Sequence, residues 1–128
     1  MKTVFVSEIS YRKARSTFER LSAESDFHYI PVAEDEASLA LAIREQHVRG
    51  FIADIHPYTG ELYQSLPQGG VIARFGVGHD SIDKYQATAN GLWVANTPGV
   101  LDNAVAEHAV WMTGSLARQI HHAHGTTA

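Results

Sequence analysis

Two closely spaced glycines are the first residues in this chain whose types and spacing could do chemistry. They lie in the segment VIARFGVGHDSID, residues 71–83, which reads as a strand that runs into a glycine turn and then into a helix. A dinucleotide-phosphate loop has this setting, but its fingerprint needs three glycines spaced G-x-G-x-x-G. Gly76 and Gly78 fill the first two places, whereas Ser81 stands in the third. No acidic residue follows in the region WVANTPG, where a ribose hydroxyl would need one, so the sequence argues against a cofactor phosphate here.

The same loop could still hold an anion. Glycines on both sides of Val77 allow a sharp turn that leaves backbone N–H groups pointing outward from the end of the strand. Exposed amides in such a turn can hold a carboxylate without any charged side chain. The spacing equally allows a plain chain reversal, with Asp80 and Asp83 as local caps.

A second candidate loop is NTPGV, residues 96–100. Asn96 favours a turn, Pro98 fixes its own φ, and Gly99 permits a positive φ. This loop would lie beside the first one if the two preceding strands are neighbours in a sheet. A plain connection from a strand to a helix is the alternative.

The histidines offer a third set of candidates. His121, His122 and His124 stand too close together for a zinc spacing, and the chain has no cysteine, so we expect no metal site. His56 and His79 fall on loops that follow predicted strands. Each could contact a substrate or could simply be a surface residue.

The elements that must position these residues alternate between short apolar runs and helical patterns. We predict strands over residues 3–7, 27–32, 50–54, 71–75 and 92–96. A helical pattern lies in each connection, and the longest covers residues 102–120. We predict Thr59, Asp83 and Asp102 as N-caps and Gly91 as a C-terminal stop.

This alternation predicts an α/β fold built from βαβ units. The natural candidate is a flavodoxin-like, doubly wound, five-stranded parallel sheet of order 2-1-3-4-5, followed by a long C-terminal helix. Ligands of such sheets bind outside the carboxyl ends of the strands, where both candidate loops would lie.

The composition of the chain limits the kinds of partner and location that we expect for the protein. The chain has 128 residues and a net charge of −4, and 45% of its residues are apolar. Nothing here favours nucleic acid or an anionic membrane as a partner. The chain has no cysteine, its start MKTVFVSEIS lacks the apolar run of a signal peptide, and no stretch approaches the roughly 18 apolar residues of a membrane span. We therefore expect a soluble, cytoplasmic protein of one compact domain.

Three motifs together carry a family resemblance. The order G-V-G-x-D-x-I-D, N-T-P-G-V and A-V-A-E-H, at the spacing found between residues 76 and 108, resembles the first domain of the D-isomer-specific 2-hydroxyacid dehydrogenases. This family includes phosphoglycerate, glyoxylate/hydroxypyruvate and D-lactate dehydrogenases. The likeness is strongest over residues 50–118.

The resemblance implies a site between two domains. Family members bind NAD or NADP in a second, Rossmann-type domain, and a small 2-oxo or 2-hydroxy acid sits in the cleft between the domains. Backbone N–H groups at positions matching Val77 and Gly78 hold the substrate carboxylate. The turn matching Ile55 and His56 also faces the cleft, and the Arg-Ser pair found there in many members is absent. The candidate substrate-binding residues are Gly76, Val77, Gly78, His56, His79, Asn96 and Pro98.

The resemblance also implies missing parts. The Arg, Glu and His that carry the family's hydride chemistry, and its G-x-G-x-x-G loop, lie beyond residue 128. We therefore expect no catalytic residue in this chain, no cofactor bound to it, and no activity of the chain alone. Residues 1–100 would form the substrate-binding domain, 101–120 an interdomain helix, and 121–128 an arm toward the absent NAD-binding domain. The family's final helix would be absent too, which would leave an apolar face exposed.

Two alternatives stay open. The chain could be a stand-alone flavodoxin-like binding or regulatory module without oxidoreductase activity. A receiver-type phosphoacceptor would want clustered acids after the first strand, where only Glu8 is present, and one acid after the third strand, where Asp54 is available. Two chains could also pair through the long helix to form a homodimer.

Overall fold

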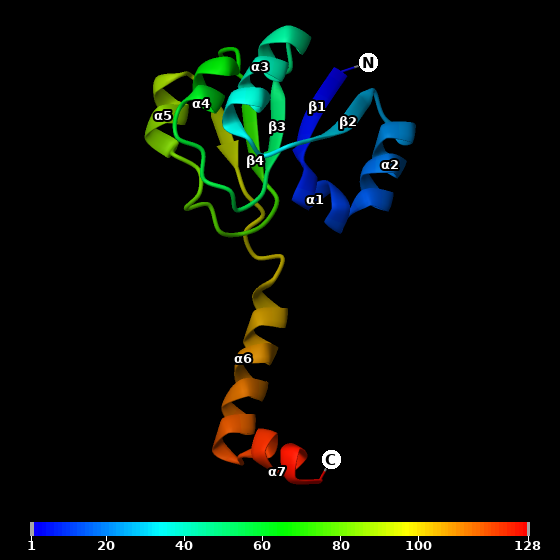
Figure 1. Cartoon of the computed structure of the whole chain (residues 1–128), viewed down its shortest axis with the longest axis vertical. Coiled ribbons are helices and arrows are strands. Elements are labelled where there is room, and N and C mark those ends of the chain that lie inside the picture. Colours follow the sequence, from blue (N-terminus) through cyan, green and yellow to red (C-terminus); the bar gives the residue numbers. More distant parts are fainter. Residues whose placement is uncertain (1, 128) are drawn as a thin grey trace. The chain divides into compact units, whose positions relative to one another are not determined.

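A five-stranded parallel sheet is the centre of the structure, a computed structural model that describes residues 2–127 (Figure 1). Its strand order is β2-β1-β3-β4-β5, which confirms the predicted flavodoxin-like arrangement. The strands are β1 Lys2–Ser7, β2 Phe27–Val32, β3 Gly50–Ala53, β4 Val71–Arg74 and β5 Trp93–Ala95. Pro31 lies in β2, an edge strand, as expected for a residue that has no N–H to donate to a ladder.

The chain divides into two compact units, one that ends at Thr97 and one that begins at Pro98. The helices are α1 Glu8–Lys13, α2 Arg15–Glu24, α3 Glu36–Gln46, α4 Glu61–Ser65, α5 Lys84–Ala89, α6 Asp102–Ala117 and α7 Ile120–Thr127. The first unit holds the sheet with α1 to α5, and the second holds α6 and α7.

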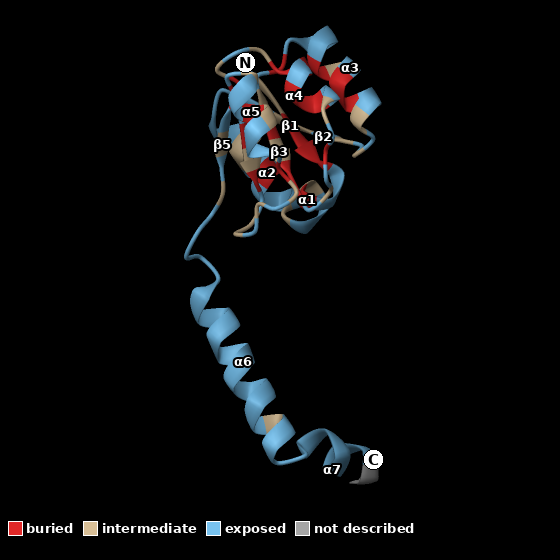
Figure 2. Ribbon diagram, turned by 90° about the vertical axis from the view of Figure 1, so that its left-hand side faces the viewer, coloured by how far each residue is buried: buried red, intermediate tan, exposed pale blue. Residues whose placement is uncertain are grey.

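One face of the sheet carries the main core. Phe51 of β3 and Ile72 of β4 point to this face, where they pack in one buried cluster with Leu39 and Ile43 of α3 and Tyr63 of α4. Figure 2 shows buried residues, in red, along the sheet and on the helices that cover it. The alternation along the strands puts the neighbouring residues on the opposite face.

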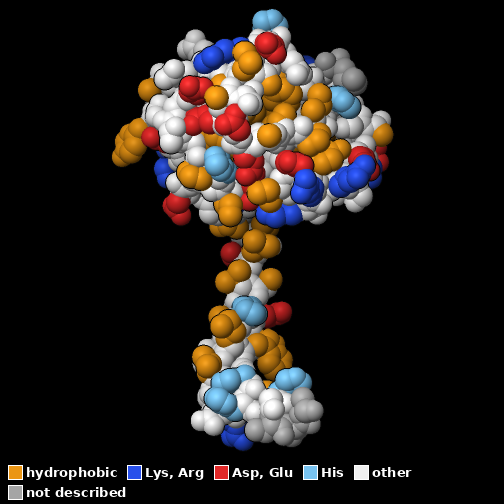
Figure 3. Space-filling view, viewed as in Figure 1, with side chains coloured by type: hydrophobic (Ala, Val, Ile, Leu, Met, Phe, Trp, Pro, Cys, Tyr) orange, Lys and Arg blue, Asp and Glu red, His pale blue; other side chains and the backbone are white. Residues whose placement is uncertain are grey.

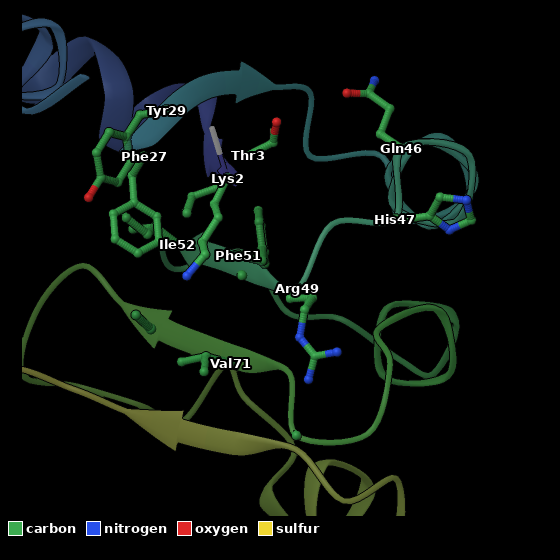
Figure 4. Close-up of a pocket in the computed structure, with 14 residues that line it drawn as sticks. Lys2, Thr3, Phe27, Tyr29, Gln46, His47, Arg49, Phe51, Ile52 and Val71 are labelled. Atoms are coloured by element: carbon green, nitrogen blue, oxygen red, sulfur yellow. The ribbon is translucent and has the colours of Figure 1, made fainter. Parts of the chain in front are cut away.

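That opposite face holds an apolar hollow of about 670 Å³, which we call the sheet-face groove. Ile52, Val71 and Ala73 line it from β3 and β4, and Phe27 and Tyr29 line it from β2 (Figure 4).

The second unit is also apolar on its surface. Among its exposed side chains are Val105, Val110, Trp111 and Leu116 of α6, and hydrophobic side chains recur along this helix in Figure 3. No residue of α6 is buried. Within the described residues, no helix has the length and apolar character needed to cross a bilayer.

Two predicted caps are wrong. Thr59 does not cap α4, because Gly60 is the N-cap and the Thr59 hydroxyl is bonded to a carboxylate from α3 instead. Asp102 does not cap α6, because Leu101 holds the N-cap position and Asp102 is already the first helical residue. At that position its charge still favours the positive end of the helix dipole.

The last part of the chain also differs from the prediction. The long helix ends at Ala117 and not at residue 120, because Gln119 adopts the left-handed conformation with φ 51°. Residues 120–127 then form α7 where we expected an arm, and residue 128 of that predicted arm lies outside the described residues.

The N-cap of α5 is confirmed and gives a first testable prediction. Asp83 Oδ1 accepts hydrogen bonds from the N–H groups of Tyr85 at 2.9 Å and Gln86 at 3.0 Å, whereas Asp80 accepts none from any described side chain or amide. We expect Asp83→Ala to lower the free energy of unfolding by about 1 kcal/mol. Asp80→Ala, which removes the same charge from the same loop, should leave it nearly unchanged. Urea unfolding followed by circular dichroism measures both, and equal losses would contradict the assignment.

Candidate functional site

The loop after β4 is held in place through its backbone. The N–H of Gly76 donates to the carbonyl of Arg74 at 2.9 Å, and the carbonyl of Gly76 accepts from the N–H of Thr97 at 3.0 Å. Gly76 has a φ of 148°, a value that favours glycine. The loop after β4 is therefore tied to the end of β5, so that two of the loops singled out from the sequence meet at one edge of the sheet.

The next two amides are free. Among the described residues, neither the N–H of Val77 nor that of Gly78 has a hydrogen-bond acceptor, and Gly78 is exposed. Asn96 Nδ2 donates to the carbonyl of Val77 at 2.8 Å. Since the C=O and N–H of a trans peptide point in opposite directions, this bond aims the Gly78 N–H away from Asn96. The loop thus presents oriented donors, as an anion site requires.

Glycine at position 78 is not demanded by packing. A Cβ built on Gly78 would meet no heavy atom within 4 Å, and the backbone there is not in the left-handed region. By contrast, a Cβ on Gly76 would lie 3.1 Å from Nη1 of Arg74. The space beside Gly78 is open to a ligand.

The candidate histidines differ in their surroundings. His79 lies 3.1 Å through Nδ1 from Nζ of Lys84, and both line a hollow of about 340 Å³ together with Asn96. His56 packs its ring edge-on against Tyr58, with 5.0 Å between ring centroids. The structure therefore brings His79 and Asn96 to one hollow that His56 does not line. Pro98 is the first residue of the second unit.

The loop after β3 is fixed by a glutamate that sequence reasoning missed. The carboxylate of Glu36 on α3 accepts hydrogen bonds from the N–H groups of Thr59 at 2.8 Å, Gly60 at 2.9 Å and Leu62 at 3.0 Å, and from the Thr59 hydroxyl at 2.8 Å. Partial burial raises the pKa of Glu36, but these four donors outweigh it and lower the pKa to about 2. Glu36 of α3 thus accepts the hydrogen bonds at the start of α4 that the sequence predicts for Thr59.

A second acid, Asp54, is committed to the fold. It is 1% exposed and accepts hydrogen bonds from Ser10 Oγ at 2.9 Å, Lys13 Nζ at 2.8 Å and the N–H of Ile55 at 2.8 Å. Burial raises the pKa of Asp54, and the bonds from Lys13, Ser10 and Ile55 lower it by more. This cluster joins α1 to the end of β3, which favours a structural role over that of an accessible phosphoacceptor.

Arg74 is a further residue that the sequence analysis passed over. Its side chain is buried, its Nη1 donates to the carbonyl of Phe75, and its Nε has no partner among the described residues. The one signal in the sequence was a cationic residue between apolar neighbours in the strand VIARF.

The Glu36 contacts give a prediction about pH. Because the pKa of Glu36 is depressed on folding, its contribution is complete above about pH 4.5 and is lost as the pH falls toward 2. At pH 7 we expect Glu36→Gln to lower the free energy of unfolding by about 1–3 kcal/mol. The difference in the free energy of unfolding between Glu36→Gln and the wild-type chain should become smaller as the pH approaches 2. Urea unfolding at several pH values measures this difference. Glu61→Gln, an exposed change at the start of α4, is the control, and a gap independent of pH would contradict the assignment.

Comparison with known proteins gives a consistent result. The family model described as D-isomer specific 2-hydroxyacid dehydrogenase, catalytic domain, matches residues 4–126. A glyoxylate reductase of Pyrococcus furiosus is 40% identical over 60 residues, which are 47% of this chain and 18% of that protein. A glyoxylate reductase of Thermococcus onnurineus is 31% identical over 95 residues, which are 71% of this chain and 28% of that protein.

Solved structures extend the likeness to the fold. An NADPH-dependent glyoxylate/hydroxypyruvate reductase from Sinorhizobium meliloti, in complex with NADP and malonate, is 26% identical with a TM-score of 0.68, and the match covers 92% of this chain and 36% of that one. An NAD⁺-bound 3-phosphoglycerate dehydrogenase of Entamoeba histolytica, 20% identical with a TM-score of 0.62, shares the fold over 88% of this chain and 38% of that one. The chain thus spans well under half the length of these proteins.

Proposed function

This chain belongs to the D-isomer specific 2-hydroxyacid dehydrogenases, and on that premise we propose that it is the substrate-binding part of an enzyme that reversibly reduces a 2-oxo acid to a D-2-hydroxy acid. The family expected from the motifs is thereby confirmed. The observation that carries the proposal is the pair of unpaired amides at Val77 and Gly78, at the carboxyl edge of the sheet.

These amides would bind the substrate carboxylate. The loop is held on the side of its carbonyls, by Asn96 and Thr97, so its donors need no rearrangement when an anion arrives. The N–H of Gly76 is already bonded to Arg74, so Gly76 would contribute through its backbone conformation and not as a donor.

The residues of this chain do not fit the nicotinamide cofactor. Ser81 stands where a dinucleotide loop has its third glycine, and the Asp83 carboxylate already occupies the N–H groups at the start of α5 where a pyrophosphate would bind. We propose that NAD or NADP, which would supply the hydride, binds to polypeptide outside this chain. The catalytic Arg, Glu and His would come from the same missing part.

The substrate would be a small acid. Ile55 and His56 replace the Arg-Ser pair of many family members, so this turn offers no guanidinium to a second acidic group of the substrate. The name of the Sinorhizobium relative gives glyoxylate and hydroxypyruvate as its substrates, and both are small acids of the size proposed here. His56 and His79 would adjust the choice among such acids.

The sheet-face groove would be covered in the intact protein. Its apolar lining from β2, β3 and β4 suits the final helix that the family resemblance leads us to expect. The exposed apolar side chains of α6 would likewise pack against the cofactor domain, and pairing of two chains through α6 is the alternative that light scattering distinguishes.

Binding of a carboxylate can be tested on the chain itself. We expect glycolate to shift the ¹⁵N–¹H resonances of Val77 and Gly78, with a dissociation constant on the order of 1 mM, because the proposed cofactor domain would supply the other contacts to the substrate. Glycolamide, its uncharged isostere, is the matched control and should leave both resonances in place. A glycolate titration that moves neither amide would refute the proposed function.

Catalysis by the chain alone is a separate question. With NADH or NADPH and glyoxylate, hydroxypyruvate or pyruvate, we expect no oxidation of the cofactor above background. The absorbance of the reduced nicotinamide measures this oxidation. The full-length Sinorhizobium reductase serves as the positive control. Turnover by this chain would show that the redox groups are not confined to the missing part.

A further inference from the structure

Arg74 is a buried cation without a counter-charge. It ends β4 with a side chain only 9% exposed, and no carboxylate of the described residues pairs with it. Its Nε also lacks any hydrogen-bond partner there. An unpaired buried charge is costly, so its presence in the fold calls for an explanation.

The guanidinium of Arg74 lies against the loop that follows β4. A Cβ on Gly76 would be 3.1 Å from Nη1 of Arg74 and 3.3 Å from its Cζ. Nη1 also donates to the carbonyl of Phe75, the residue that opens the loop. The free amides of Val77 and Gly78 directly follow Gly76 in the sequence, so the positive charge contacts the segment that leads into the two donors.

The acids of the same loop do not neutralise this charge. Asp80 and Asp83 are both exposed, so water screens them. The Asp83 carboxylate is in addition committed to the amides of α5. The buried acid Asp54 is already paired with Lys13.

We propose that Arg74 is the fixed positive charge of the carboxylate site, an inference that rests on the proposed function. Arg74 is a positioning residue: it holds the Phe75 carbonyl, and its field favours an anion at the amides of Val77 and Gly78. The substrate carboxylate is the counter-charge that the fold itself does not provide. In this arrangement the charge of the site comes from the end of β4, whereas the turn at Ile55 and His56 offers no guanidinium.

Charge and hydrogen bonding can be separated by substitution. Arg74→Gln keeps a donor for the Phe75 carbonyl and removes the charge, and we expect it to weaken glycolate binding roughly tenfold or more. Arg74→Lys keeps the charge, so its affinity should stay within a few-fold of the wild type. Arg44→Met removes the same charge from an exposed position on α3 and should leave binding unchanged. Glycolate titrations followed at the Val77 and Gly78 amides measure all three.

The melting temperature of a further variant distinguishes the proposed role of Arg74 from a purely structural one. If Arg74 only stabilised the fold, its replacement would lower the melting temperature. Arg74→Met replaces an unpaired charge by an apolar side chain of similar length, so the melting temperature should hold or rise while glycolate binding weakens as in Arg74→Gln. If Arg74→Gln fails to fold, Arg74→Met provides the uncharged variant for the glycolate titration.

The outcomes separate the two proposals. Wild-type binding with tenfold weaker binding in the uncharged variants and near-normal binding in Arg74→Lys supports the inference. Equal affinity in wild type and the uncharged variants, or an equal loss in Arg74→Lys, overturns it and leaves the proposed function standing. Absence of binding to the wild-type chain overturns the proposed function, and the role of Arg74 falls with it.

Discussion

The direction of two adjacent peptide groups, Gly76–Val77 and Val77–Gly78, determines which hydrogen-bonding groups the loop after β4 exposes. A trans peptide cannot point its carbonyl and its N–H the same way, so a loop that fastens its carbonyls from one side must show its amides on the other. Asn96 and Thr97 provide that fastening from the end of β5. Both belong to a different loop from the one they hold, which makes the neighbouring position of β4 and β5 in the sheet a condition for the site.

The acids around this edge do structural work. Glu36 fixes the loop after β3 and Asp54 ties α1 to the same strand end, each through several donors. Both pKa values are depressed, so both carboxylates stay ionised at neutral pH. Neither is suited to exchange a proton in a reaction at that pH. This agrees with the proposed function, in which this chain would bind and orient a small acid without exchanging a proton through these carboxylates.

Local signals predicted the fold well and the site only in part. The Asp83 cap and the left-handed Gly91 follow from patterns of a few adjacent residues, and the strand order follows from the alternation of strands and helices along the chain. Thr59 failed as a cap because its true partner, Glu36, is 23 residues away in the sequence. Arg74 was missed because its burial depends on the tertiary structure around the end of β4, which no local pattern encodes. The glycine spacing found the loop, but the free amides became evident only once the partners of their neighbours were known.

The two edges of the sheet are unequal. β2 carries a proline, so its ladder has a missing donor, while β5 has three residues, none of them proline, and an exposed Trp93. A strand from another chain could therefore pair with the backbone of β5 without interruption, whereas Pro31 interrupts the row of donors in β2. The shortness of β5 limits such pairing, and an insertion that lengthened β5 would offer a longer exposed edge to a strand of another chain.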